Sequence, residues 1–283
     1  MLKAPRNVFR RVRRSIAQRG VRNLARNVWS RVVGHHQNNA VAAAEIKEQV
    51  RIQGSQKHPF DEQFGVETSG VISWLELDTG HTHDLYTVNY YGIAPSLFRG
   101  VMTRWLSIAG KPSLSEYIFI DLGSGKGRAV LLAAELPFKA CLGVEMNRSL
   151  SDISQHNMGV WMAANNAQSP MTAICQDAAE FVFPDTRCVV YLFNPFTAQL
   201  LKKVIANIAG AFANRPGELD VIYVNSEFAS TLANHPGFGL LWEGQIELSE
   251  EDAAFDRAHQ LASAATAHFP AGSEPCSIWR WRG

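Results

Sequence analysis

The sequence has little cysteine, and its four cysteines lie far apart. Cys141, Cys175, Cys188 and Cys276 form no C-x-x-C pair and no Cys/His cluster at zinc spacing. Three of them lie within apolar runs, where a free thiol packs as a small core residue. We therefore expect a reducing compartment and no metal site.

Long apolar runs are also missing. No stretch approaches the roughly 20 residues needed to span a bilayer, and the N-terminus lacks the uninterrupted apolar block of a secretory signal. Apolar residues make up 46% and charged residues 19% of the 283 residues, which is typical of a globular protein with a sizeable core. These features predict a cytoplasmic protein.

Acidic residues are absent from residues 1–44, which contain ten lysines and arginines. The whole chain has a net charge of +1, so the remainder carries a net charge of −9. Apolar positions three or four apart over residues 5–33 predict one or two amphipathic helices with an arginine face. The sequence leaves three interpretations open: a contact with anionic lipid or nucleic acid through residues 1–33, a cleavable organelle presequence, or a solvated helix on the body. The first would make the protein peripheral at a membrane or a nucleic-acid binder.

From residue 117 onward, apolar runs alternate with helix-compatible stretches. This alternation predicts an α/β fold with a doubly wound, mostly parallel seven-stranded sheet. The final two strands are expected to form a hairpin-like pair around an acidic insertion, residues 249–267. We predict an arm and linker over 1–44, a lead-in over 45–110 and the main domain over 111–283. The expected strands are 117–121, 140–145, 172–176, 188–193, 219–224, 238–248 and 277–282, and the expected helices are 127–136, 148–165, 197–213 and 227–234.

The stretch FIDLGSGKGR, residues 119–128, places three glycines directly after an apolar run. A nucleotide P-loop would require glycine at 120 and Ser or Thr at 127, where the chain has Ile120 and Gly127. A dinucleotide fingerprint would require glycine at 128, where the chain has Arg128. Both nucleotide interpretations therefore fail, and we expect Lys126 to be a solvated residue at the start of a helix.

The remaining pattern, D-x-G-x-G-x-G, resembles the first motif of class I S-adenosylmethionine-dependent methyltransferases. Asp121 ends the strand, where a carboxylate suits a ligand that carries an ammonium and a sulfonium. The resemblance implies that Glu145 accepts the ribose hydroxyls and that Asp177 holds the exocyclic amino group of adenine, with Met146 and Ala178 as further cofactor-binding residues. The loop residues that it assigns to the cofactor are Asp121, Gly123, Ser124, Gly125 and Gly127.

The resemblance extends upstream through FDEQFGVETSG (60–70) and YYGIAP (90–95). Together with the glycine loop, these segments resemble a bacterial family of class I methyltransferases of unassigned substrate. They are distantly similar to the non-SET histone-lysine methyltransferases. The resemblance implies that Tyr91, Pro95 and Thr68 border the cofactor. The chain departs from the family at Ile93, where a second proline is expected.

The fourth strand ends in Asn194-Pro195-Phe196. This segment resembles part of the (D/N)PP(Y/F) motif of amino-methylating enzymes, which orients the acceptor nitrogen. We therefore predict that these three residues are catalytic and that the acceptor is a nitrogen of a protein or small molecule. A nucleic-acid methyltransferase that uses the arginine arm and a non-catalytic cofactor-binding module remain as alternatives. An NAD-dependent oxidoreductase is disfavoured by Asp121 and Arg128.

Three other sets of side chains are given structural roles. We expect His81 and His83 to be solvated, and His156 to lie on a helix surface. Alternation along the last strand predicts that Trp279 and Trp281 pack in the core, while the intervening arginines face the other way.

Overall fold

The computed structural model describes residues 57–72, 90–110, 112–260 and 272–283. The chain divides into two units, and the site lies in the unit formed by residues 56–255 and 270–283. The predicted basic arm, the linker, and His81 with His83 lie outside the described residues. Within the described part of the chain, no helix is both long and apolar enough to cross a membrane.

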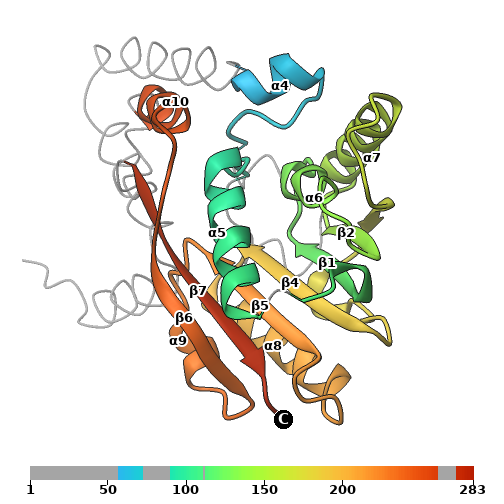
Figure 1. Ribbon diagram of the computed structural model, residues 1–283, viewed down its shortest axis with the longest axis vertical. Coiled ribbons are helices and arrows are strands. Elements are labelled where there is room, and N and C mark those ends of the chain that lie inside the picture. Colours follow the sequence, from blue (N-terminus) through green and yellow to red (C-terminus); the bar gives the residue numbers. More distant parts are fainter. Residues whose placement is uncertain (1–56, 73–89, 111, 261–271) are drawn as a thin grey trace, which may run out of the picture. The chain divides into compact units, whose positions relative to one another are not determined.

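Seven strands form one sheet in the order β3-β2-β1-β4-β5-β7-β6 (Figure 1). The first five along the chain pair in parallel, whereas β7 is antiparallel to both of its neighbours. The predicted mostly parallel sheet with a terminal antiparallel pair is therefore confirmed. The strands are β1 (Tyr117–Leu122), β2 (Ala140–Glu145), β3 (Met171–Cys175), β4 (Arg187–Phe193), β5 (Leu219–Val224), β6 (Phe238–Glu247) and β7 (Ser273–Trp281).

Helices cover both faces of the sheet, as Figure 1 shows. One face packs against α5, α6 and α7, and the other packs against α8 and α9. The helices are α4 (Pro59–Phe64), α5 (Pro95–Ile108), α6 (Arg128–Ala133), α7 (Arg148–Ala163), α8 (Ala198–Ala211), α9 (Ser230–Ala233) and α10 (Glu250–Gln260), with short 3-10 turns η2 (Leu114–Glu116) and η3 (Ala178–Glu180).

Alternation along each central strand separates two hydrophobic cores. Phe119 and Val189 face the first set of helices, whereas Ile120 and Val190 face the second. This arrangement follows from the two-residue side-chain period of a strand, because a strand covered on both faces must be apolar at every position. The near-continuous apolar runs in the sequence are explained by this double burial.

Several predicted side-chain environments are confirmed. Trp279 and Trp281 are buried, with 5% and 4% of their surfaces exposed, and His156 is exposed. All four cysteines are free thiols, and only Cys175 is not fully buried. The acidic insertion begins with α10, whose Asp252 accepts a hydrogen bond from the backbone N–H of Ser96 at 2.8 Å.

Helix α5 belongs to the core, although it falls within the predicted lead-in. Its residue Trp105 is fully buried, and its indole N–H donates a 2.8 Å hydrogen bond to Asp220 on β5. Arg280 on β7 donates two further bonds of 2.8 Å to the same carboxylate. One buried carboxylate therefore joins α5 to two neighbouring strands.

Replacement of this carboxylate should destabilise the fold strongly. Asp220→Ala leaves a buried indole N–H and a guanidinium without their acceptor, so we expect a loss of about 3–5 kcal/mol in the free energy of unfolding. Urea denaturation followed by tryptophan fluorescence measures it. The control is Glu135→Ala, which removes an exposed ion pair with Arg99 and should cost less than about 1 kcal/mol. Equal losses in the two variants would contradict the prediction.

Candidate functional site

A cavity opens at the carboxyl ends of β1, β2 and β4, where the strand order reverses between β1 and β4. Such a switch point is where open α/β sheets bind ligands, because the loops on either side diverge. The wall residues are Tyr90, Tyr91, Gly92, Ile93, Asp121, Gly123, Ser124, Gly125, Arg128, Ala129, Val144, Glu145, Met146, Asn147, Leu150, Gln176, Asp177, Ala178, Tyr191, Phe193, Pro195, Phe196 and Leu200.

Most of the residues predicted for the site meet in this cavity. They come from five segments that are widely separated in the sequence, and the carboxyl ends of the strands bring them together. The predicted residues on the wall are Tyr91, Asp121, Gly123, Ser124, Gly125, Glu145, Met146, Asp177, Ala178, Pro195 and Phe196. The structure does not place Thr68, Gly127 or Asn194 on this wall.

Two loop glycines allow neighbouring segments to approach closely. Gly123 has a φ of 84°, and a Cβ there would lie 2.4 Å from the side chain of Pro195. Gly125 has a φ of 53°, and its Cβ would lie 2.2 Å from the ring of Tyr90. A side chain at either position would be strained by the backbone and would also collide with the opposite wall. The glycines therefore serve the packing of the cavity walls around the loop.

Glu145 is tied to the loop by backbone groups. Its carboxylate accepts 2.9 Å and 2.8 Å hydrogen bonds from the N–H groups of Gly125 and Asn147. Burial raises the pKa of Glu145, although hydrogen bonds from Asn147, Gly125 and Met146 oppose the shift. The carboxylate is thus held in a fixed orientation at the end of β2.

Asp121 lies at the end of β1 with 4% of its surface exposed. Burial, and to a smaller extent the charge of Glu145, raises the pKa of Asp121 to about 8. Burial thus favours the neutral form of this carboxyl group in the ligand-free protein. A cationic ligand would favour the charged form and release that proton.

Asp177 follows β3 and caps η3. Its Oδ1 accepts a 2.8 Å hydrogen bond from the N–H of Ala179, and the side chain is buried. This is the arrangement of an N-cap residue, which satisfies a free N–H at the start of a helical turn. Since Asp177 also lines the cavity, the cap fixes its carboxylate beside the site.

Asn194 sits at the rim, outside the cavity wall, with a φ of 40°. Its side-chain NH₂ donates to Glu227 at 3.3 Å, and its carbonyl accepts from the Tyr223 hydroxyl at 3.0 Å. Because a carboxylate can only accept, Glu227 fixes which end of the amide faces each neighbour. Asn194 is therefore held by two residues of the β5 region that the sequence analysis did not assign to the site.

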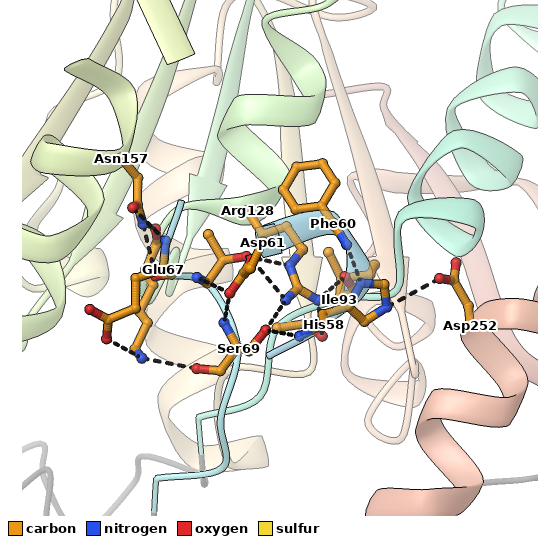
Figure 2. Close-up of polar contacts among 12 residues, drawn as sticks. His58, Phe60, Asp61, Glu67, Ser69, Ile93, Arg128, Asn157 and Asp252 are labelled. Atoms are coloured by element: carbon orange, nitrogen blue, oxygen red, sulfur yellow. Dashed lines mark hydrogen bonds and ion pairs between the residues drawn. The ribbon is translucent and has the colours of Figure 1, made fainter. Parts of the chain in front are cut away.

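Arg128 organises the opposite wall and was not assigned to it from the sequence. Figure 2 shows its guanidinium among residues of the lead-in. It donates to the Thr68 hydroxyl at 2.6 Å and to the carbonyl of Ile93 at 3.0 Å, and it lies 3.5 Å from Asp61. Thr68 therefore lies behind the wall, where it binds Arg128 and Asp61. Because five donors in a fixed fork can serve several carbonyls, arginine suits this junction.

The prediction that Lys126 is solvated was wrong. Only 6% of its surface is exposed, and its ammonium lies 2.9 Å from both the Glu67 carboxylate and the Ser69 carbonyl. Asn157 on α7 donates to the backbone carbonyls of Glu67 and Lys126 as well (Figure 2). The lysine faces the lead-in segment, whose long-range contacts leave no periodic signal in the sequence.

Gly127, another residue predicted for the site, lies against α7. Gly127 starts α6 with a φ of 88°, and a Cβ there would lie 2.3 Å from Ser154 on α7, so this glycine serves helix packing. Among the described residues, no group of three or more His, Cys, Asp or Glu side chains could hold a metal ion.

The buried carboxyl group of Asp121 should make stability fall as pH rises. Its pKa in the folded protein is raised to about 8, whereas an unfolded aspartate titrates near 3.9. The folded state therefore binds the extra proton between these values, and stability is lost across that window. We expect ligand-free Asp121→Asn to gain up to about 1.4 kcal/mol relative to wild type for each pH unit from 5 to 8.

Urea denaturation at four pH values measures this difference. Asp152→Asn, at an exposed position on α7, is the control and should give a flat difference over the same range. A constant difference between wild type and Asp121→Asn would contradict a neutral Asp121.

The model of one known protein family matches part of the chain. The model of a family described as histone methylation protein DOT1 matches residues 104–168, which include the glycine loop and Glu145. None of the curated proteins compared with the chain matches it.

Solved structures resemble the chain more loosely. TrmN from Thermus thermophilus gives a TM-score of 0.44 at 14% identity, covering 67% of this chain and 49% of that one. Magnesium protoporphyrin IX methyltransferase from Synechocystis, solved with bound SAM, gives 0.42 at 13% identity, covering 65% and 79%. The chain thus spans about half the length of the Thermus protein, and likenesses at these TM-scores carry no argument about the site. The family model matches less than a quarter of the chain, and this match fits the resemblance of the glycine loop to class I S-adenosylmethionine-dependent methyltransferases.

Proposed function

We propose that the protein transfers the methyl group of S-adenosylmethionine to a nitrogen atom of a protein or small molecule. The observation that carries the proposal is the contact between two motifs. Pro195 of the Asn-Pro-Phe segment lies against Gly123 of the glycine loop, and Phe196 lines the same cavity. The segment assigned to the acceptor therefore adjoins the loop assigned to the methyl donor.

In this proposal, each carboxylate at a strand end binds one part of the cofactor. Glu145 accepts the ribose hydroxyls, Asp177 accepts the adenine amino group, and Asp121 faces the ammonium of the amino-acid end. The wall formed by Tyr91 closes the cavity from the lead-in side. The fixed orientations of Glu145 and Asp177 support these roles, because preorganised acceptors lose little freedom when the ligand arrives.

Methyl transfer from a sulfonium is an in-line displacement, so positioning and exclusion of water can supply much of the catalysis. The acceptor nitrogen must be uncharged, since its lone pair forms the new bond. The Asn194 carbonyl has a second lone pair beyond the one used by Tyr223. We assign that lone pair to an N–H of the acceptor. Glu227 supports this role because it accepts from the NH₂ end of the amide, which leaves the carbonyl as the end that can accept from the acceptor N–H.

A nucleic-acid acceptor is the second candidate, and the ten basic residues within residues 1–44 favour it. Binding of that kind would weaken steeply with salt, because each phosphate contact releases counterions. Deletion of residues 1–44 would then abolish nucleic-acid binding. The net charge of −9 on the remainder favours the protein or small-molecule acceptor.

The cofactor assignment predicts that Glu145→Ala weakens binding of S-adenosylhomocysteine. Loss of the acceptor for the ribose hydroxyls should cost about 1.5–3 kcal/mol, the usual scale for a hydrogen bond to a charged group. Isothermal titration calorimetry measures the affinity of both proteins. Glu135→Ala, which alters a surface carboxylate on the far side of α6, should bind like wild type. Failure of wild-type protein to bind would refute the proposed function.

The nitrogen assignment predicts a base-stable product. Labelled S-adenosylmethionine should transfer its methyl group to protein or small-molecule fractions of a cell extract, and the label should survive alkali, which hydrolyses methyl esters. Asn194→Ala should slow transfer by about 100-fold, the scale of a misplaced acceptor, with unchanged binding of S-adenosylhomocysteine. The matched control is Asn214→Ala at an exposed position. Alkali-labile label would exclude nitrogen as the acceptor.

A further inference from the structure

Tyr191 carries a polar group that the fold itself does not use. The residue lies on β4, is fully buried and lines the cavity. Its hydroxyl has no hydrogen-bond partner in the part of the chain that the structure describes. Nothing in the sequence analysis assigned it to the site, because the surrounding run of apolar residues predicts a core strand.

A buried hydroxyl without a partner is unfavourable, since it has lost its hydrogen bonds to water. The ring of Tyr191 packs 5.4 Å from that of Phe98 and 5.7 Å from that of Phe119, measured between centroids. A phenylalanine would make the same aromatic contacts without the unsatisfied oxygen. Because Tyr191 is one of the residues that line the cavity, a bound ligand is a group that could supply the missing partner.

The neighbours of Tyr191 indicate which ligand. Tyr191 is the register partner of Asp121 in the parallel pairing of β4 with β1. Register partners on adjacent strands point to the same face of a sheet, so the phenol and the carboxyl group lie side by side. Ser124, on the same cavity wall, also has a buried hydroxyl without a partner among the described residues. Two residues that line the cavity therefore each bury an unsatisfied hydroxyl.

We propose that the hydroxyl of Tyr191 is a further cofactor ligand that, with the carboxylate of Asp121, binds the ammonium group of the cofactor's amino-acid end. This inference rests on the proposed function. An ammonium has three donors and no acceptor, and the phenol oxygen and carboxylate both offer acceptor lone pairs. Its positive charge also favours the ionised form of Asp121, which burial otherwise disfavours. The adenosine end has no comparable cation, so the Tyr191 hydroxyl and the Asp121 carboxylate together bind the amino-acid end.

Three probes separate this role from a general effect on the site. S-adenosylhomocysteine carries the ammonium and the carboxylate, its decarboxylated analogue carries only the ammonium, and 5′-methylthioadenosine carries neither. We expect Tyr191→Phe to weaken the first two by about 10-fold, the scale of one hydrogen bond to a charged group. The affinity for 5′-methylthioadenosine should stay within about twofold, because that ligand makes no contact with the hydroxyl.

Thermal unfolding of the ligand-free protein gives an independent readout. Tyr191→Phe should unfold at the same temperature as wild type or higher, because the variant removes an unsatisfied buried hydroxyl. A merely structural role would lower the unfolding temperature and weaken all three probes alike. Tyr117→Phe is the matched control, since its buried ring lies at the opposite end of β1, where its hydroxyl accepts from Arg187 at 3.3 Å.

Three outcomes would overturn the inference. Unchanged affinity for S-adenosylhomocysteine in Tyr191→Phe would mean that the hydroxyl makes no hydrogen bond to the cofactor. Equal weakening of all three probes would assign it a structural role. Loss of affinity for S-adenosylhomocysteine alone would place the hydroxyl at the carboxylate instead of the ammonium. If wild-type protein bound none of the probes, the proposed function would fall and this inference with it.

Discussion

The site depends on the close approach of neighbouring segments to a loop in which every second residue is glycine. Between Asp121 and Arg128, two glycines leave room for Pro195 on one side and Tyr90 on the other. The acceptor segment and the lead-in can therefore both reach the end of β1. A single Cβ at either glycine would push one wall away, and the cavity would lose its shape. Every proposed role in the site presupposes this contact.

Arg128, at the end of the glycine loop, connects this loop to the lead-in segment. Its guanidinium binds side chains and carbonyls of segments that lie 35 to 60 residues away in the sequence. The pKa of Asp61 is lowered because hydrogen bonds from Thr68 and the charge of Arg128 outweigh the effect of burial. A buried ion pair adds little net stability, because the cost of desolvating both charges offsets their attraction, whereas removing one partner leaves an unpaired buried charge. Here the pair holds the wall that contains Tyr91 and Ile93, since Arg128 donates to the carbonyl of Ile93.

Two groups on the cavity wall are buried at a cost in free energy when no ligand is bound. Burial favours the neutral form of Asp121, and Tyr191 buries a hydroxyl that has no partner among the residues that the structure describes. Local conflicts of this kind are expected at functional sites, because the ligand supplies what the fold leaves unsatisfied. The contrast with Asp220 is informative, since that equally buried carboxylate has three donors supplied by the protein itself. The carboxylate of Asp220 is satisfied by the fold, whereas burial raises the pKa of Asp121.

The sequence by itself determined the sheet, the two-sided burial of its strands and the glycine loop. These features follow from local patterns: alternation of apolar runs with helical stretches, and glycines directly after a strand. It also ordered Asp121, Glu145 and Asp177 at successive strand ends, which the topology then brought to one cavity. Only the tertiary structure decided that Lys126 is buried, that α5 is a core helix and that Thr68 lies behind the wall. Likewise, only the structure showed that the hydroxyl of Tyr191 has no hydrogen-bond partner within the described part of the chain. Those properties depend on contacts between segments far apart along the chain, and no local pattern of residues encodes which distant side chain will fill a given space.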